Sequence, residues 1–322
     1  MIKRDLSDLP TSLAPSDGDA DGWWPDRHPR LGPILVDQWI AAQPDNALEV
    51  VIPADGKHRG SNAGKCLRAI AYDQTDTERS DPMTVADFWR MYLGSVVHEA
   101  LQEALPKVMP GAMNEVPVSL VPIGAAGSMR IDIMDPVSMD SDGHIYETVE
   151  VKTINGFGYK MQATDFRGPP QGPRSSHMMQ AAIGAVAAEA AGYQVAGARV
   201  VYLSLELLSP KLAEQVGLGG EEARFCAEWF VPIEQLRPLV EVEMGRWAEL
   251  TEALGDDPTV IRRSMLDEID PHGVPKYIEI VNPKTGAAVD EAGVGARAWL
   301  CNYCNHQSTC IRDFEKEKEA AS

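Results

Sequence analysis

The amino-acid sequence predicts one α/β domain with an extension at each end. Helical and strand-like patterns alternate along the middle of the chain, and no internal repeat or shift in composition divides it. The helical patterns cover 84–105, 175–192 and 233–254, and the strand-like runs cover 115–121, 127–135, 144–153, 197–208 and 223–233. Three strand-like runs in succession, enclosed by helices, favour a sheet with helical cover.

Composition and charge limit the class of protein. The chain has 322 residues, of which 44% are hydrophobic and 24% are charged, as in ordinary globular proteins. Its net charge of -19 argues against a protein that binds nucleic acid over its whole surface. A local basic groove, or acidic residues that hold metal ions against phosphates, would still be compatible with this charge.

The sequence predicts a cytoplasmic protein with no membrane partner. Its start, MIKRDLSDLP, lacks the apolar region of a secretory signal, and no uninterrupted apolar run reaches membrane-spanning length. In the cytoplasm, cysteines are more often thiols or metal ligands than disulfides.

The domain is expected to span residues 31–312. Residues 1–30 are rich in Asp, Pro, Ser and Gly, which predicts a poorly ordered arm. Ser61 is a plausible N-cap for the helix that carries Cys66. Residues 313–322 are expected to form a charged, solvated tail.

Local patterns predict the elements around the three central strands. The helix at 84–105 is amphipathic. Its large apolar residues recur at helical spacing: Phe88, Tyr92, Val96, Leu101 and Leu105. The tetrapeptide DSDG at 140–143 predicts a turn, the Gly- and Pro-dense stretch at 155–174 a loop, and 255–300 an irregular segment.

Charged residues on the strand IYETVEVKT point to chemistry. Because side chains alternate between the two faces of a strand, Glu150 and Lys152 share one face and Val151 lies on the other. A carboxylate and an ammonium in that position need an explanation. A surface ion pair on a half-exposed strand is the more common explanation for a lone Glu-x-Lys.

The preceding strand carries Asp132 between two isoleucines. Asp is depleted in strands, and a buried one needs a hydrogen-bonding partner or a metal. If the two strands pair as a hairpin, Asp132 and Glu150 lie side by side and raise each other's pKa unless a cation separates them. Mg²⁺ or Mn²⁺ suits oxygen ligands, and Lys152 would then face the metal-bound water. A structural Asp is the alternative, and Asp135, beside a proline, is a weaker candidate.

Cysteines gather near the C-terminus in the stretch CNYCNHQSTC. The spacing Cys301-x2-Cys304-x5-Cys310 lets one loop surround a metal centre, and unligated thiols this close would oxidise readily. The candidates for a fourth ligand are His306, in a zinc site, and the two remaining cysteines, Cys66 and Cys226. Cys226 alternates with apolar residues and is interpreted as a core thiol.

The order of the motifs resembles the RecB-like branch of the PD-(D/E)xK nucleases. GSVVHEAL, RIDIMD, VEVKT and HMMQAAIGAVAAEAAGY follow one another as the helical His, strand Asp, Glu-x-Lys strand and helical Gln do in that branch. The resemblance implies a divalent metal held by the side chains of His98, Asp132 and Glu150 and the backbone carbonyl of Val151. A lone helical His is otherwise more often a core or surface residue.

The resemblance also assigns roles to two further residues. It implies that Lys152 is the catalytic lysine and that Gln180 helps to hold this lysine and the substrate. The chain departs from the family in one place, because Gly184 stands where the family usually carries a Tyr. This departure bears on the role of Gln180 and leaves the metal ligands unaffected.

The cysteines resemble those of the iron–sulfur members of the same branch, such as the CRISPR-associated RecB-like exonucleases and the nuclease domain of the AddB subunit. In these members one Cys lies upstream of the catalytic helix, in a Ser…Cys-x-Arg stretch, and three follow the core as Cys-x2-Cys-x5-Cys. The residues that match are Cys66, Cys301, Cys304, Cys310 and Arg68. The resemblance implies a [4Fe–4S] cluster that joins the two ends of the chain, with His306 beside it.

The implied fold is a restriction-endonuclease-like core with a mixed central sheet flanked by helices, closed by an iron–sulfur clasp from the N- and C-terminal segments. The core would cover about residues 84–253. The resemblance itself extends over about residues 60–312 as short motifs.

The implied function is that of a metal-dependent DNA exonuclease acting on single strands or duplex ends, in recombination, repair or phage DNA processing. The residues expected to contact DNA are Arg68, Lys160, Arg167 and Arg174, with Tyr159 stacking on bases; a solvated loop is the alternative for 155–174. A homo-oligomer would concentrate this basic patch. The alternatives are a CRISPR adaptation nuclease that processes spacer precursors, a non-catalytic DNA-end-binding protein with a structural metal, and a zinc-binding interaction protein.

Overall fold

The structure is a computed structural model, and it describes most of the chain after residue 56. The described residues are 57–81, 84–109, 111–141, 143–217, 220–254, 257–261, 263–269, 273–279, 288–289, 295–296 and 304–320. Every described residue belongs to the unit formed by residues 48–322, which we call the second unit. The predicted arm at 1–30 and Cys301 lie outside the described residues, and the boundaries 31 and 312 stay predictions.

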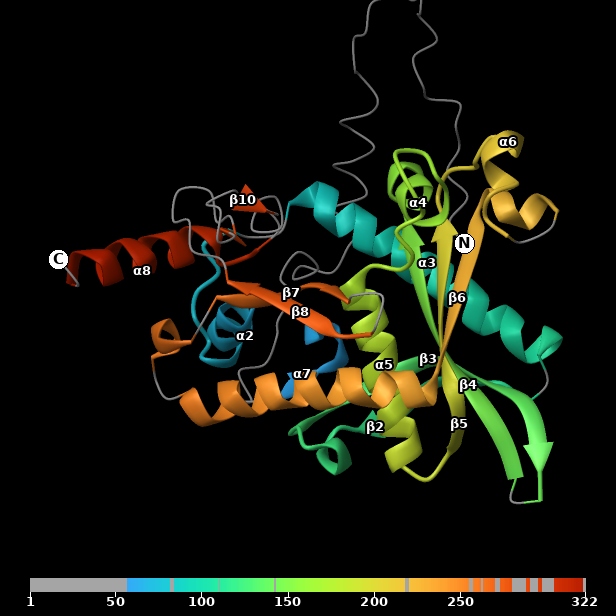
Figure 1. Cartoon of the computed structure of the whole chain (residues 1–322), viewed down its shortest axis with the longest axis horizontal. Helices are drawn as coiled ribbons and strands as arrows, with labels where there is room; N and C mark the ends of the chain where they lie inside the picture. Colours follow the sequence, from blue (N-terminus) through green and yellow to red (C-terminus); the bar gives the residue numbers. More distant parts are fainter. Residues whose placement is uncertain are drawn as a thin grey trace, which may run out of the picture. The chain divides into compact units, whose positions relative to one another are not determined.

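A mixed sheet forms the centre of the second unit (Figure 1). Its strands are β1 (His58–Arg59), β2 (Met113–Ser119), β3 (Gly127–Asp140), β4 (Gly143–Ile154), β5 (Gln194–Ser204) and β6 (Cys226–Pro232). The order is β1-β3-β4-β5-β6, and β2 also pairs with β3. β4 and β5 are parallel, while β3 with β4 and β5 with β6 are antiparallel. The predicted mixed sheet is therefore confirmed.

Helices cover both faces of this sheet. The α-helices are α2 (Leu67–Gln74), α3 (Val85–Val108), α4 (Gly156–Ala163), α5 (Ser175–Ala190), α6 (Pro210–Ala213), α7 (Ile233–Ala253) and α8 (Gln307–Ala320). Short 3₁₀ helices are η2 (Gly60–Asn62), η3 (Val121–Ile123), η4 (Glu221–Arg224) and η5 (Pro258–Val260). No helix among the described residues combines the length and apolar character needed to cross a membrane.

The two faces of the sheet bury different helices. On one face, α5 and α7 pack into the main core, which includes the fully buried Trp247 and Tyr202. On the other face, Leu105 of α3 packs on Val149 and Val151 of β4. Figure 1 shows α5 and α7 on one side of the strands and α3 running diagonally across the other.

Small residues let α5 lie close to the sheet, and they explain Gly184. A Cβ atom at Gly184 would lie 3.2 Å from Cε of Met129 and 3.5 Å from Cγ1 of Ile131, so this side of α5 faces β3. The Tyr expected from the family resemblance would meet the packed sheet here. Gly184 is thus a packing residue.

Several predicted elements differ from the observed ones. The stretch at 155–174 is not all loop, because α4 begins after Asn155, whose side-chain oxygen accepts the Gly158 N–H at 2.7 Å. Ser61 lies in η2, and Cys66 itself is the N-cap residue of α2. β3 continues past Asp135 with a register shift between Pro136 and Ser138.

The C-terminal part is more regular than expected. Within 255–300, β7 (Ser264–Ile269) and β8 (Pro275–Glu279) form an antiparallel pair, and β9 (Ala288–Val289) pairs with β10 (Gly295–Ala296). The residues predicted as a solvated tail continue α8 to Ala320.

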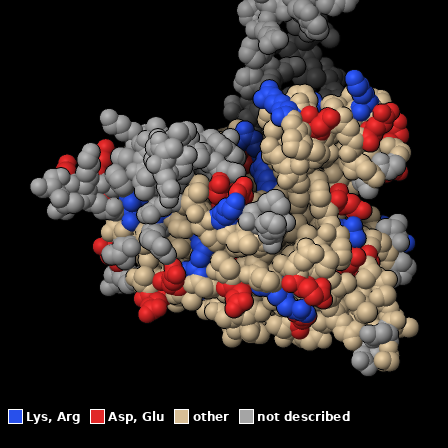
Figure 2. All heavy atoms as spheres, viewed as in Figure 1, with Lys and Arg blue, Asp and Glu red and all other residues tan. Residues whose placement is uncertain are grey.

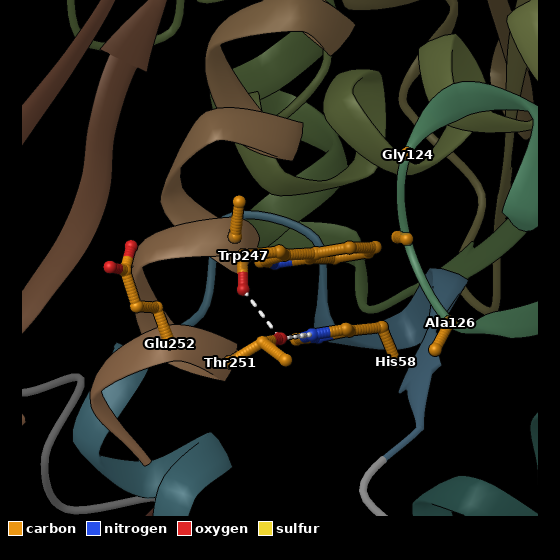
Figure 3. A pocket seen from close by; sticks show the side chains of 8 residues that line it. His58, Gly124, Ala126, Trp247, Thr251 and Glu252 are labelled. Atoms are coloured by element: carbon orange, nitrogen blue, oxygen red, sulfur yellow. Dashed lines mark hydrogen bonds between the residues drawn. The ribbon is translucent and has the colours of Figure 1, made fainter.

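A cavity of about 290 Å³ lies between β1 and α7 (Figure 3). The His58 imidazole stacks on the Trp247 indole, with ring centroids 4.6 Å apart and an interplanar angle of 4°. The Thr251 hydroxyl donates to the Trp247 carbonyl at 2.8 Å, so the His58 Nε2–H donates to Thr251 Oγ1 at 3.1 Å. Burial lowers the pKa of His58 to about 4, which keeps the ring neutral.

This histidine predicts an acid-dependent loss of stability. The unfolded chain binds the proton near pH 6.5, whereas the folded chain binds it only near pH 4, so stability falls as pH falls through this window. His58→Phe keeps a ring against Trp247 and cannot protonate. The difference in free energy of unfolding between His58→Phe and wild type should shift in favour of the variant by up to about 3 kcal/mol from pH 7 to pH 4, measured by urea titration. Parallel pH profiles for the two proteins would contradict this.

Candidate functional site

The candidate site lies where β3 and β4 separate. Their pairing ends at Ile133 and Val149, one residue before Asp132 and Glu150, while β4 stays paired with β5 as far as Ile154. Oδ2 of Asp132 accepts the Val151 N–H at 2.8 Å and so replaces the missing strand partner. The two predicted carboxylates therefore flank the point at which the strands diverge.

Helix α3 brings His98 to the same point. Its Nε2 lies 3.1 Å from the carbonyl oxygen of Val151, and its Nδ1 lies 3.9 Å from Oδ1 of Asp132. One turn earlier, a Cβ atom at Gly94 would lie 3.2 Å from Oγ1 of Thr153, so the glycine lets α3 approach β4 closely. A capping box of Thr84 with Asp87 begins this helix.

On the other face of β4, Glu150 and Lys152 form an ion pair with a third partner from α5. Oε1 of Glu150 lies 2.6 Å from Nζ of Lys152, which also donates to Oε1 of Gln180 at 3.2 Å. Glu150 is only 4% exposed. Burial raises the pKa of Glu150 to about 7; Lys152 opposes this shift and Asp132 adds to it. The carboxylate is thus poised between its protonated and ionised forms near neutral pH.

Tyr202 and His177 complete this face and were not singled out from the sequence. Tyr202 of β5 is the register partner of Lys152 and is fully buried. Its hydroxyl accepts the Arg174 N–H at 2.8 Å and donates to Nδ1 of His177 at 2.8 Å. Burial, helped by the charges of Lys152 and Arg174, lowers the pKa of His177 to about 3. This neutral histidine lies one turn before Gln180 on α5, so the Tyr202 hydroxyl fixes the end of the helix that holds Lys152.

The residues predicted to contact DNA divide into two groups. Arg167 and Arg174 are exposed, and Lys160 is partly exposed. Tyr159 is buried, and its hydroxyl donates to the Ala223 carbonyl at 3.1 Å, so the prediction that it stacks on bases is corrected. Arg68 is 4% exposed and donates to the carbonyls of Ile261 and Thr259, which makes it a packing residue rather than a DNA contact.

Described cysteines from both ends of the second unit act electrostatically on residues at the start of α2. Burial raises the pKa of Cys66, and the charge of Cys310 raises it further. The charge of Cys304 acts on Lys65, the neighbour of Cys66. Nε of Arg263 donates to Sγ of Cys310 at 3.3 Å.

Cys226, in contrast, lies on β6, where burial and the charges of Glu228 and Glu222 raise its pKa. The three described cysteines of the predicted set thus act on the region beside α2, where the described residues form no metal-binding group, and Cys226 lies elsewhere.

Hydrogen bonds join α8 to the segment 72–81, independently of any metal. Asp81 accepts both the N–H and the hydroxyl of Ser308 at 2.7 Å, and Ser80 accepts the Thr309 N–H at 3.0 Å. These bonds satisfy N–H groups at the start of α8. The Tyr72 hydroxyl donates to Asp313 at 2.9 Å. We call this contact between 72–81 and 305–313 the α2–α8 clasp.

His306 is buried within the α2–α8 clasp. Its Nε2 lies 3.2 Å from Oδ1 of Asp73, while its Nδ1 is buried and makes no hydrogen bond within the described part of the chain. A carboxylate on one ring nitrogen and a free second nitrogen are typical of histidines that bind metals.

A buried network holds the loop that carries Cys66. Glu243 of α7 is fully buried and accepts the Gly64 N–H at 2.9 Å, a guanidinium N–H of Arg246 at 2.6 Å and the Tyr277 hydroxyl at 2.7 Å. Arg246 also donates to the carbonyl of Lys65 at 3.3 Å. The position of Cys66 thus depends on α7 and β8 as well as on α2.

We call the point where β3 and β4 separate, with His98, Asp132, Glu150 and Val151 around it, the strand fork. Its residues are of the chemical types that bind a hard divalent cation. They offer two carboxylates, one imidazole and one peptide carbonyl, which are donors that Mg²⁺ and Mn²⁺ accept. Within the described residues, no three His, Cys, Asp or Glu side chains are already grouped closely enough for a metal ion. In this arrangement the Glu150 carboxylate is paired with Lys152 instead.

The Tyr202 hydroxyl supports a stability prediction. Tyr202→Phe leaves the Arg174 N–H without its acceptor and Nδ1 of His177 without its donor, so it should lower the free energy of unfolding by about 1–3 kcal/mol. Tyr193→Phe is the matched control, because the Tyr193 hydroxyl makes no hydrogen bond to another described residue, and it should change stability by less than about 0.5 kcal/mol. Equal urea midpoints for the two variants would show that the Tyr202 hydroxyl holds nothing.

No protein-family model and no curated protein matches the chain. Two solved structures are similar to it at a low level. The crystal structure of SSO0001 has a TM-score of 0.43 and 16% sequence identity, over 87% of this chain and 94% of that chain. The crystal structure of LHK-Exo in complex with dAMP has a TM-score of 0.33 and 13% identity, over 64% of this chain and 95% of that chain. At these TM-scores neither likeness carries an argument about this chain.

Proposed function

We propose that the chain is a metal-dependent deoxyribonuclease that hydrolyses phosphodiester bonds in single-stranded DNA or at duplex ends. The observation that carries this proposal is the buried Glu150 carboxylate at the strand fork, with Asp132 beside it and Lys152 paired to it. A structural ion pair would not need a second carboxylate there, because Asp132 raises the cost of ionising Glu150. A site that receives a divalent cation explains both carboxylates.

The metal would be Mg²⁺ or Mn²⁺, held by His98, Asp132, Glu150 and the carbonyl of Val151. When bound, such an ion lowers the pKa of its water and offsets charge on the phosphate. The chain supplies the alignment of these donors: Asp132 is fixed by the Val151 N–H, and His98 by the start and close approach of α3. Both contacts pre-order the ligands before the metal arrives.

Lys152 would act on the phosphate. Its ammonium donates to Gln180 and pairs with Glu150, so its position is set from both β4 and α5. With Glu150 as a metal ligand, Gln180 would still hold the lysine, whose remaining N–H groups would be able to donate to a phosphate oxygen. Lys160, Arg167 and Arg174 would contact the DNA backbone from the segment between β4 and α5.

We also propose that Cys66, Cys301, Cys304 and Cys310 hold a [4Fe–4S] cluster within the α2–α8 clasp. The electrostatic influence of Cys310 on Cys66 supports it, and so does the Arg263 N–H donated to the Cys310 sulfur, a contact that suits a thiolate ligand. A zinc site with His306 is the competing cofactor, favoured by the unpartnered Nδ1 of His306. The cluster would stabilise the fold, since its ligands come together only on folding.

Nuclease activity tests the central proposal. Wild-type protein with Mn²⁺ should release nucleotides from end-labelled single-stranded DNA, and Lys152→Ala should lower the rate by roughly 100-fold or more. Lys107→Ala removes an exposed lysine of α3 and should leave the rate unchanged. Folded wild-type protein that binds DNA ends and releases no nucleotide at any metal concentration would identify a non-catalytic end-binding protein instead.

Colour and metal content test the cluster. Protein purified without oxygen should be brown and contain iron and sulfide, and Cys310→Ser should lose both, whereas Cys226→Ser and Lys152→Ala should keep them. A colourless protein with stoichiometric zinc that is lost in His306→Ala would replace the cluster with the zinc site. The result is independent of nuclease activity, since it is read from absorption and elemental analysis.

A further inference from the structure

Two phenylalanines in the segment between β4 and α5 are exposed. Phe157 of α4 is 53% exposed and Phe166, shortly after α4, is 41% exposed. Their rings meet edge to face, with centroids 6.3 Å apart. The core contact of this helix is made by Tyr159, which is fully buried, so the two phenyl rings are not needed to fix α4 on the sheet. Exposed aromatic pairs of this kind mark interaction surfaces.

Cationic side chains lie over both rings. The guanidinium carbon of Arg167 is 5.3 Å from the Phe157 centroid and 5.6 Å from the Phe166 centroid, and Nζ of Lys160 is 5.7 Å from the Phe166 centroid. We call these four residues the Phe157–Phe166 patch. The stretch 155–174 carries three basic residues and one acidic residue, a net charge of +2, in a chain of -19. Figure 2 shows Lys and Arg side chains beside the lobe that carries α4. This local charge complements a polyanion.

Both ends of the segment with the patch are fixed at the candidate site. It leaves β4 just after Lys152 and returns to α5 at Arg174, whose N–H is bound by Tyr202. Internal hydrogen bonds shape it between these ends, including Gln171 N–H to the Met161 carbonyl at 3.3 Å. The patch therefore belongs to the connection between the two elements that position Lys152.

We propose that the Phe157–Phe166 patch stacks the unpaired bases of single-stranded DNA and leads that strand to the candidate site. This inference rests on the proposed function, and it names the form of DNA that the site receives. Unpaired bases can turn their faces to a protein ring, whereas bases inside a duplex are stacked on both sides, and aromatic rings next to cations are the usual platform for a single strand. Arg167 and Lys160 would pair with the phosphates on either side.

A DNA-binding measurement tests the role of this patch independently of DNA cleavage. In a Lys152→Ala background without added divalent metal, so that the strand stays intact, the affinity for a labelled single strand measured by anisotropy should fall by about 10-fold or more after Phe157→Ala with Phe166→Ala. The affinity for a blunt duplex of the same sequence should change by less than about twofold. Phe157→Tyr with Phe166→Tyr keeps both rings and should retain the affinity. Phe230→Ala removes another exposed phenylalanine with an arginine, Arg199, over its ring, and it should have no effect.

The outcomes are distinct. The proposal is wrong if the parent protein does not bind the single strand, or if the double Ala variant keeps its affinity. It is also wrong if the affinities for single strand and duplex fall equally. If the wild-type protein cleaves no DNA yet the double Ala variant selectively loses the single strand, the proposed nuclease fails and the patch stands. Arg167→Gln gives a second test, because it should lower the affinity for the single strand and reduce the salt dependence of binding.

Discussion

The burial of the Glu150 carboxylate is the constraint on which the rest of the site depends. A carboxylate at 4% exposure loses its water, and Asp132 adds a second negative charge nearby. Lys152 is the described cation that compensates it, at 2.6 Å. The lysine must then be held, and this explains why Gln180 reaches it from α5 and why Tyr202 fixes the start of that helix. The two polar groups are joined through α5, which carries both His177 and Gln180.

A second constraint is the α2–α8 clasp, which joins segments that are distant in the sequence. Residues of α8 fill hydrogen-bonding positions on the segment 72–81, and the buried Glu243 fixes the loop that presents Cys66. These contacts bring thiols from far apart in the chain into one region before any cofactor binds. A metal centre here would add to an existing contact between distant segments, so its loss should loosen the α2–α8 clasp first and the central sheet later.

The sequence was sufficient for the elements with strong periodic patterns. The alternating pattern in β3 and β4 predicted both strands, and it predicted that Glu150 and Lys152 share one face. The helical spacing of apolar residues in α3 predicted the helix that carries His98. α4 was missed because its glycines suggest a loop, although Asn155 supplies a good N-cap. Tyr159 was assigned to DNA for the same reason: in a loop it resembles Phe157, but two residues apart on a helix the rings point to different sides. His177 and Tyr202 depend on the register of β4 with β5, which no local pattern encodes.

The central claim is that the buried Glu150 carboxylate awaits a divalent cation, and calorimetric titration with Mn²⁺ tests it directly. Because burial raises the pKa of Glu150 to about 7, Mn²⁺ binding should tighten as pH rises through this value and should release a proton below it. Glu150→Gln should bind weakly and lose this proton release. Equal Mn²⁺ affinity in wild type and Glu150→Gln, or no binding by the folded wild-type protein, would contradict the claim.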